Sequence, residues 1–408
     1  MSVGPTNKPF SRAKLMEIKL SSLLEVTKAI NNNFSTTELL EIFKKVATDQ
    51  LQIGKLVLLA FDEGWKTIMK FGTNDLPEFD VEAKLGHIKE ISFVNLSEGN
   101  VKLDFDIVIP VFHKSSPLAY VLIGDINEQK LEMSPTIRHL PFIQTLTNII
   151  IVAIENKKLF KENLKQAAIK KELELASEMQ SMLFPSTLPS NATMDIAAFY
   201  LPHRQVGGDY YDFIRLNENE VAFCMADVSG KGVAAALLMS NFQANLRILL
   251  QHITSLTDLV KELNTIVMNN AKGEKFITFF IAKYNHVTKI LNYVNAGHNP
   301  PIILSGNTTS LLRTGCTGLG MFDEIPRVRE GLVHMQTPAT IVCYTDGVVE
   351  VENNSNLEFG TASLEKLMID GREQSMTELN SNIIRSLDRH REDQPYIDDI
   401  TLFTCRFF

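Results

Sequence analysis

Ala226-Asp-Val-Ser-Gly-Lys-Gly232 joins an apolar run to a helical pattern. The run Glu220–Ala226 is short and apolar, as buried strands are, and apolar residues recur at helical spacing in Ala234–Leu250. The two glycines of the joining stretch permit a tight turn, because glycine adopts backbone conformations that other residues avoid. We therefore expect Asp227 at the point where the chain leaves a sheet.

Three further motifs place an aspartate in the same kind of position. They are Val206-Gly-Gly-Asp-Tyr-Tyr-Asp212, Tyr344-Thr-Asp-Gly347 and Asp398-Asp-Ile-Thr401. Asp346 is expected at the end of the strand Ala339–Tyr344, with Gly347 as the turn residue, and Asp398 just before the terminal strand. A single Asp-Gly pair is ordinary turn chemistry. Several strands that each deliver an aspartate to one end of a sheet need a further explanation.

Acidic side chains gathered in one place repel one another unless cations compensate their charge. Oxygen ligands favour Mg²⁺ or Mn²⁺, and the four widely spaced cysteines supply no CxxC pair for zinc. The aspartates therefore predict a two-metal carboxylate centre, in which paired ions clamp a phosphate and activate a bridging water.

The four motifs, with Asn295-Ala-Gly-His-Asn-Pro-Pro301 and Gly318-Leu-Gly-Met321, resemble those of the metal-dependent type 2C (PPM) protein phosphatases. The resemblance is closest to the SpoIIE-like branch, whose members dephosphorylate regulators of alternative sigma factors in bacteria. It covers about Asp195 to Phe408. It implies an α+β domain with a central β-sandwich flanked by helices, and metals in a cleft at one end.

The resemblance also implies roles for single residues. Asp227 would bridge both ions, and the backbone carbonyl of Val228 would bind one of them. Asp346 and Asp398 would hold the second ion. Asp209 would complete the acidic cluster through a water on the metal, so the catalytic residues implied are Asp227 and Asp209.

One ligand stays open between two neighbours. Asp399 occupies a position where the wider superfamily often has Asn, so either Asp398 or Asp399 is the ligand.

Residues near the motifs have plainer interpretations. Eukaryotic members hold the substrate phosphate with an arginine, but the bacterial branch generally lacks it, so Arg204 is interpreted as a surface residue. His298 is interpreted as a turn residue rather than a general acid, and Asp212 as support for a turn. Gly230-Lys-Gly232 lacks the Ser or Thr that follows the lysine of a nucleotide-binding loop.

The first third of the chain alternates helical and strand patterns. Helices are expected at Leu23–Ile30 and Thr36–Thr48, with Ser35 or Thr36 as the cap of the second, and strands at Lys55–Phe61, Phe105–Phe112 and Leu118–Asp125. This order resembles a GAF-type α/β sensory domain. The resemblance implies a sensor, whose signal the residues do not identify.

Between Leu140 and Phe184 apolar residues recur at intervals of three and four, and Lys and Glu crowd the other faces. The pattern predicts a long helix with one buried stripe, which a two-stranded coiled coil buries. The alternative is a single helix packed on its own domain. Because the helix is longer than a normal domain helix and lies between two domains, we expect pairing and a homodimer. Pro185 and Pro189 end it.

These patterns divide the chain into four parts. Residues 1–14 are expected to be a flexible tail, 15–140 the GAF-like sensory domain, 141–186 the helical coiled-coil linker, and 187–408 the SpoIIE-like phosphatase domain.

Charge, hydropathy and cysteine usage argue against nucleic-acid-binding, membrane-spanning and secreted proteins. The net charge of −8 argues against nucleic-acid binding, which usually needs a concentrated basic face. The longest uncharged apolar stretch, Leu140–Ile154, is shorter than the roughly 20 residues of a membrane helix. Residues Met1–Lys14 contain no apolar signal segment. We therefore expect a cytoplasmic protein without a membrane span, which the cysteine usage fits.

The leading hypothesis is a serine/threonine phosphoprotein phosphatase with two Mn²⁺ or Mg²⁺ ions. Its substrate would be a phosphorylated regulator of the anti-anti-sigma-factor type, and its activity would be controlled by the sensor domain. The alternative is a catalytically silent dimeric signalling scaffold of the same fold. A metal-dependent hydrolase of small phosphate esters is a third possibility.

Overall fold

The structure is a computed structural model that describes residues 12–73, 79–94, 97–98, 101–102, 105–113, 116–124 and 139–408. The chain forms two compact units, Met1–Ala167 and Ala168–Phe408. The expected tail, residues 1–14, lies mostly outside the described residues. Residues 12–14 of the expected tail belong to helix α1 (Arg12–Asn31). The first helix was expected to start at Leu23, so this expectation was wrong. No Gly or Pro interrupts this stretch, so the helix continues in both directions.

The first unit is built on a five-stranded antiparallel sheet in the order β2-β1-β7-β6-β3. Its strands are β1 (Lys55–Phe61), β2 (Trp65–Phe71), β3 (Ser92–Phe93), β6 (Ile107–His113) and β7 (Ser116–Gly124). A separate pair is formed by β4 (Ser97–Glu98) and β5 (Val101–Lys102). A turn is expected at Lys114–Pro117, but Ser116 and Pro117 already belong to β7. Residues 114–115 and the expected strand end at residue 125 lie outside the described residues.

Helices cover both faces of this sheet. On one face α1, α2 (Thr36–Lys45) and the first turns of α4 (Leu140–Ser181) share a core with alternate residues of β1, such as Leu56 and Leu58. On the other face α3 (Val81–Leu85) packs against Val57 and its neighbours. The central strands are thus buried on both faces, which explains their continuous apolar runs. Ser35 caps α2 in a capping box with Glu38, and a π-helical turn, Val46–Gln50, replaces the last expected α-turn.

Helix α4 is continuous over 42 residues. It ends three residues before the expected Phe184. Ile143, Leu146 and Ile150 are buried in the core of the first unit. Farther along, Phe160 is 63% and Leu164 54% exposed, so none of the described residues covers the apolar stripe over that stretch.

The second unit contains two sheets packed face to face. One has the order β15-β12-β11-β10-β9 with β16 beside β12, and the other the order β14-β13-β17-β18-β8. The first sheet comprises β9 (Tyr210–Arg215), β10 (Glu220–Val228), β11 (Ile277–Asn285), β12 (Ile290–Ala296), β15 (Gly315–Cys316) and β16 (Gly331–His334). The second comprises β8 (Met194–Leu201), β13 (Ile302–Ser305), β14 (Thr308–Leu311), β17 (Ala339–Tyr344) and β18 (Ile400–Phe407).

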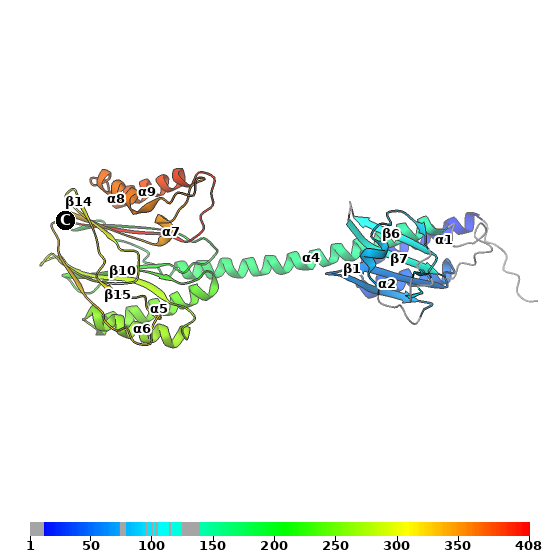
Figure 1. Ribbon diagram of the computed structural model, residues 1–408, viewed down its shortest axis with the longest axis horizontal. Helices are drawn as coiled ribbons and strands as arrows, with labels where there is room; N and C mark the ends of the chain where they lie inside the picture. Colours follow the sequence, from blue (N-terminus) through cyan, green and yellow to red (C-terminus); the bar gives the residue numbers. More distant parts are fainter. Residues whose placement is uncertain are drawn as a thin grey trace, which may run out of the picture. The chain divides into compact units, whose positions relative to one another are not determined.

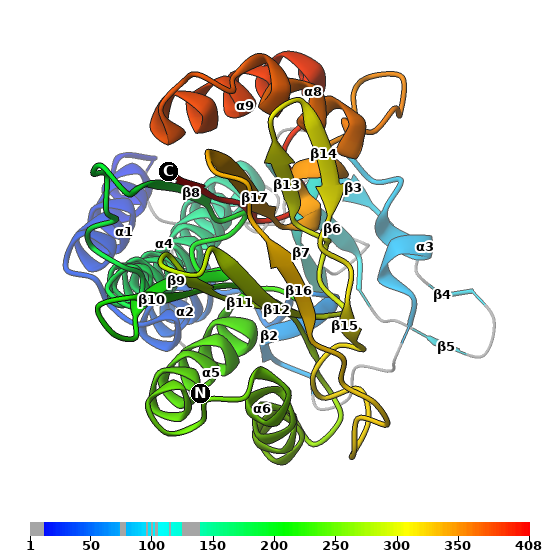
Figure 2. The same ribbon diagram turned by 90° about the vertical axis from the view of Figure 1, so that its left-hand side faces the viewer.

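Three apolar clusters hold this unit together. Phe223 and Phe280 of one sheet meet Ile341 and Phe403 of the other in the interior. Helices α5 (Val233–His252) and α6 (Leu256–Ala271) cover the outer face of the first sheet, and α8 (Gly360–Asp370) and α9 (Met376–Arg391) that of the second. Figures 1 and 2 show these helix pairs on opposite sides of the sheets. The second unit is therefore a mixed α+β sandwich with helical outer layers.

Some elements differ from the sequence expectations. Strand β9 and the short strands β14 to β16 were not expected, because their sequences are polar or interrupted by turn residues. Asp346 does not end a strand before a glycine turn. It is the first residue of a short helix, α7 (Asp346–Val349), with Thr345 as the N-cap residue.

Helix α5 is long and apolar enough to cross a membrane by length and composition alone. Its buried face, which includes Met239, Phe242 and Leu246, packs in the core of the second unit. This is how a core helix of a globular domain is built.

Candidate metal centre

The expected aspartates come from strand ends that meet at one end of the sandwich. Asp209 precedes β9 and Asp227 is the penultimate residue of β10; these strands are antiparallel, with Tyr210 opposite Ala226. Asp346 follows β17 and Asp398 lies just before β18, and Tyr344 pairs with Leu402. In each antiparallel pair the end of one strand lies beside the start of the other. Pairing thus brings four distant chain segments together in two pairs.

Three glycines let these segments approach closely. A Cβ atom on Gly207 would lie 2.3 Å from Oδ2 of Asp399, and one on Gly347 would lie 2.1 Å from the Asp399 carbonyl oxygen. A Cβ atom on Gly208 would lie 2.9 Å from the carbonyl oxygen of Val228. All three separations are too short for a real side chain. These glycines are therefore required by the packing of the loops that carry the acids.

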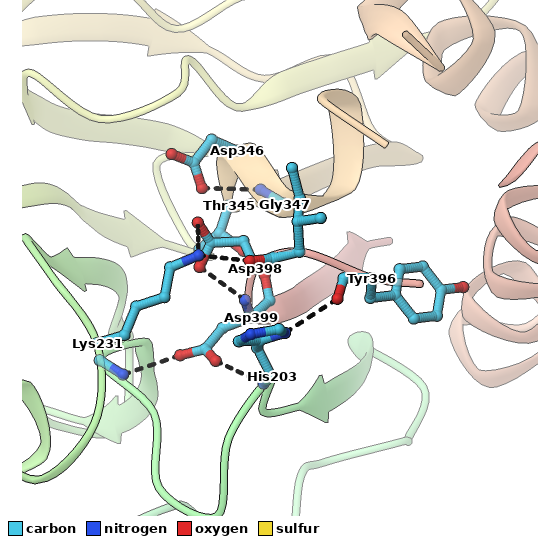
Figure 3. A network of polar contacts seen from close by, with 10 residues as sticks. His203, Lys231, Thr345, Asp346, Gly347, Tyr396, Asp398 and Asp399 are labelled. Carbon is cyan, nitrogen blue, oxygen red and sulfur yellow. Dashed lines mark hydrogen bonds and ion pairs between the residues drawn. The ribbon is translucent and has the colours of Figure 1, made fainter. Parts of the chain in front are cut away.

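Asp399 connects these loops through hydrogen bonds to their backbone. Its Oδ1 accepts a hydrogen bond from the His203 backbone N–H at 2.7 Å, and its Oδ2 accepts one from the Gly208 N–H at 2.9 Å. Figure 3 shows the carboxylate of Asp399 turned toward His203, while Asp398 faces Lys231. Both oxygens of Asp399 are thus used by backbone donors of other loops, whereas Oδ2 of Asp398 is paired with a lysine side chain.

Asp209, which is buried, and Asp227, which is half-buried, form the centre of the cluster. Asp209 is 2% exposed, and its Oδ2 accepts a hydrogen bond from the Thr401 hydroxyl. Burial, together with the charges of Asp227 and Asp399, raises the pKa of Asp209 well above its usual range. Burial and the charge of Asp346 raise the pKa of Asp227 to about 7, although a hydrogen bond to Asp209 acts in the other direction. Without a cation, these acids resist being charged together.

Asp346 and Asp398 form the more open side of the cluster. Burial and the charge of Asp398 raise the pKa of Asp346, whose Oδ1 accepts a hydrogen bond from the Gly347 N–H at 2.8 Å. Oδ2 of Asp398 lies 2.8 Å from Nζ of Lys231. A cavity of about 90 Å³ borders this side, and its lining includes Glu350, Tyr396 and Asp398.

The donor set fits divalent cations in its chemistry. It consists of aspartate oxygens, with the Val228 carbonyl oxygen close to Gly208. The aspartates raise one another's pKa values, and a bound cation would lower these pKa values again. In the described part of the chain, however, no three acidic, His or Cys side chains already stand in a metal-binding arrangement. The charges of the acids act on one another, and binding a metal ion would require their side chains to come closer together.

The structure also gives the positions of the other residues that the sequence analysis considered. Arg204 is exposed, as expected. His298 is buried, and its Nδ1 lies 2.9 Å from the Thr278 hydroxyl. Asp212 does not support a turn. It lies inside β9, fully buried, and accepts two hydrogen bonds from Arg247 of α5 at 2.7 and 3.0 Å.

Sequence reasoning missed two residues that contact the site. Lys231 lies within the Asp227 motif, where it was weighed only as part of a nucleotide-binding loop. Gln180, near the end of α4, is 6% exposed, donates to the Gly207 carbonyl at 2.8 Å and accepts from the Gly207 N–H at 3.2 Å. The signal in the sequence is the position of Gln180 at helical spacing between Ala176 and Leu183, where a polar residue falls in the apolar series.

Comparisons with known proteins agree with this architecture. The family model described as stage II sporulation protein E (SpoIIE) matches residues 217–408. Phosphoserine phosphatase RsbU of Bacillus subtilis (strain 168) is 32% identical over 243 residues, which cover 59% of this chain and 71% of that protein. Phosphoserine phosphatase RsbP of the same organism is 25% identical over 237 residues, or 56% of each chain.

A solved structure shows the same fold. The SiaA-PP2C domain of Pseudomonas aeruginosa superposes with a TM-score of 0.54 at 20% identity, covering 60% of this chain and 99% of that domain. The paired sheets of the second unit therefore form a PP2C-type fold. From the extent of the RsbU match and the SpoIIE match, the chain belongs to the SpoIIE family of PP2C-type serine/threonine protein phosphatases.

Proposed function

We propose that the protein is a metal-dependent phosphatase that removes phosphate from serine or threonine of a regulatory protein of the anti-anti-sigma-factor type. The observation that carries this proposal is the meeting of Asp209, Asp227, Asp346 and Asp398 at one end of the sandwich. The names of RsbU and RsbP, both phosphoserine phosphatases, support the reaction class.

Two Mn²⁺ or Mg²⁺ ions would be held by the aspartates and the Val228 carbonyl. Asp227, at the centre, would bridge them, and Asp346 and Asp398 would hold the second ion. Bound ions supply charge stabilisation of the phosphate and a water that is nucleophilic at neutral pH. Asp209 would complete the acidic cluster beside Asp227, and its carboxylate accepts a hydrogen bond from the Thr401 hydroxyl.

The chain needs no cysteine nucleophile for this reaction. Cys224 is buried in β10, and burial raises the pKa of its thiol well above the usual range. It is therefore a core residue. His298 is also unsuited to donate a proton, because burial lowers its pKa to about 3. Proton transfer during the reaction would therefore be carried out by groups of the acid cluster.

We also propose that residues 15–140 form a GAF-like sensory domain, that residues 141–186 are the linker, and that residues 187–408 form the phosphatase domain. The sheet of the first unit, with helices on both faces, supports a sensory role by analogy only. An unidentified signal there would change the pairing of two α4 helices in a cytoplasmic homodimer. Gln180 and Phe184 would pass this change to the loop of Asp209, since Phe184 packs on the rings of Tyr200 and Tyr211.

The test is release of phosphate from a phosphoserine-containing anti-anti-sigma-type protein by the full chain with Mn²⁺. Activity should disappear with a chelator, return with added Mn²⁺, and fall about a hundredfold to a thousandfold in Asp227→Asn, as expected for the loss of a central charge-stabilising group. Free phosphoserine is the matched substrate and should be hydrolysed much more slowly. Turnover that survives both chelation and Asp227→Asn would contradict the metal mechanism.

A further inference from the structure

Lys231 forms the closest cationic contact that the structure shows within the acid cluster. Its Nζ lies 2.8 Å from Oδ2 of Asp398, and it donates a hydrogen bond to the Ile397 carbonyl. Figure 3 shows its side chain extended across the loop toward Asp398. Its charge also acts on Asp346. The lysine therefore neutralises the side of the cluster where the second metal ion would bind.

Other cations near this loop are differently engaged. Lys275 donates to the carbonyl of Ser229 at 2.8 Å, and Arg204 is exposed beside Gly232. Lys231 is the one of these three with an ion pair to a proposed metal ligand. Its contact is thus not a general property of the basic residues around the loop.

A metal ion and Lys231 would compete for the same oxygen. Oδ1 of Asp398 already accepts the Asp399 N–H at 2.9 Å, and Oδ2 holds the ammonium. A divalent ion on Oδ2 would repel the ammonium at short range. The lysine can move away, because its side chain is 35% exposed and Gly230 and Gly232 flank it with φ of 84° and 83°.

We propose that Lys231 is an exchangeable counter-ion: it neutralises Asp398 until metal binds, and then turns to bind the phosphate of the substrate. The inference rests on the proposed function, since it assumes that a phosphate enters this site. A displaced ammonium at the edge of the cluster would meet a dianionic phosphate in a partly buried place. A charge-assisted hydrogen bond is favourable there. Lys231 would then hold the substrate phosphate, which is the role of the arginine in the eukaryotic members.

The first measurement is calorimetric titration of the full, chelator-treated chain with Mn²⁺. Lys231→Met should bind Mn²⁺ about tenfold more tightly than the wild type, because the competing charge is gone, whereas Lys231→Arg should stay close to the wild type. Lys261→Met is the matched control, since Lys261 also forms an ion pair, with Asp258, but on helix α6. Equal or weaker Mn²⁺ binding by Lys231→Met would overturn the counter-ion role.

The second measurement is titration of the Mn²⁺-loaded proteins with inorganic phosphate. Lys231→Met should bind phosphate about tenfold more weakly, and Lys231→Arg should keep most of the affinity. Unchanged phosphate affinity in Lys231→Met would overturn the phosphate contact. Both titrations are independent of turnover. If they succeed while the wild type hydrolyses no phosphoprotein, the proposed function fails and the role of Lys231 stands.

Discussion

The buried ring of His298 illustrates how a single residue couples the sandwich to pH. His298 is 5% exposed and pairs with Thr278, the residue opposite Asp227 in the sheet. Burial lowers its pKa to about 3 in the folded protein, whereas an unfolded histidine titrates near 6.5. Below pH 6.5 the unfolded state therefore binds a proton that the folded state does not. This group contributes its full stability above pH 6.5 and loses it as the pH falls toward 3.

We expect this group alone to lower the free energy of unfolding by about 2 kcal/mol at pH 5 relative to pH 8. Replacing His298 with Gln should remove that part of the pH dependence. Urea unfolding of the chelator-treated chain at both pH values measures it. The buried aspartates act in the opposite direction, since a raised pKa costs stability as the pH rises, so only the difference between variant and wild type is informative.

The matched control is His252→Gln, which changes an exposed histidine at the end of α5. It should leave the pH dependence as in the wild type. An equal slope in His298→Gln and the wild type would show that the ring is protonated in the folded protein.

At the scale of single residues, the sequence indicated which aspartates belong to the candidate site but not which contacts each of them makes. The four motifs each carry an aspartate, and in the structure the charges of these aspartates act on one another. Their metal roles stay predictions. The clamp by Asp399 and the ion pair of Lys231 depend on contacts across 166 or more residues, which no local pattern encodes.

Elements with a clear apolar period were predictable, and those governed by tertiary contacts were not. β1 has the expected bounds, Lys55–Phe61, because a continuous apolar run has few alternatives. β9 was missed because Asp212 interrupts its pattern. The buried carboxylate is compensated inside the sheet by the ion pair with Arg247 on α5 and by hydrogen bonds from the Tyr210 hydroxyl and the Phe213 N–H. α7 was missed because Asp-Gly usually marks a turn.

The end of helix α4 gives the prediction at the scale of the element. Gln180 makes two hydrogen bonds to Gly207, two residues before Asp209. Replacing Gln180 with Ala should leave both polar groups of Gly207 unsatisfied and lower the free energy of unfolding by about 1–3 kcal/mol. Because the loop then loses its anchor, we also expect Mn²⁺-dependent phosphatase activity to fall about tenfold.

Met179→Ala is the control, because Met179 precedes Gln180 on the same helix but is 70% exposed. Urea unfolding and the phosphoprotein assay report the two effects separately. Loss of stability without loss of activity in Gln180→Ala would mean that this anchor does not hold Asp209 in place.

For the whole molecule, the uncovered stripe of α4 is the feature that the single chain leaves unexplained. The lysine- and glutamate-rich faces of this helix suit water, but Phe160, Leu164 and Ile169 do not, and each is about half exposed or more. A second copy of the helix would cover them in a coiled coil. We therefore expect the full chain to sediment as a dimer of about twice 45.8 kDa.

Leu164→Glu tests this expectation because it places a charge on the stripe twice in every dimer. The buried leucine side chain contributes about 1.5–3 kcal/mol in each copy, so association should weaken at least about a hundredfold. Lys165→Glu changes the adjacent residue on the polar face and should leave the dimer intact. Sedimentation over a range of concentrations separates the two variants. If both stay dimeric, the chains associate through another surface; if the wild type is a monomer, α4 is a single rod, and control by helix pairing has no physical basis.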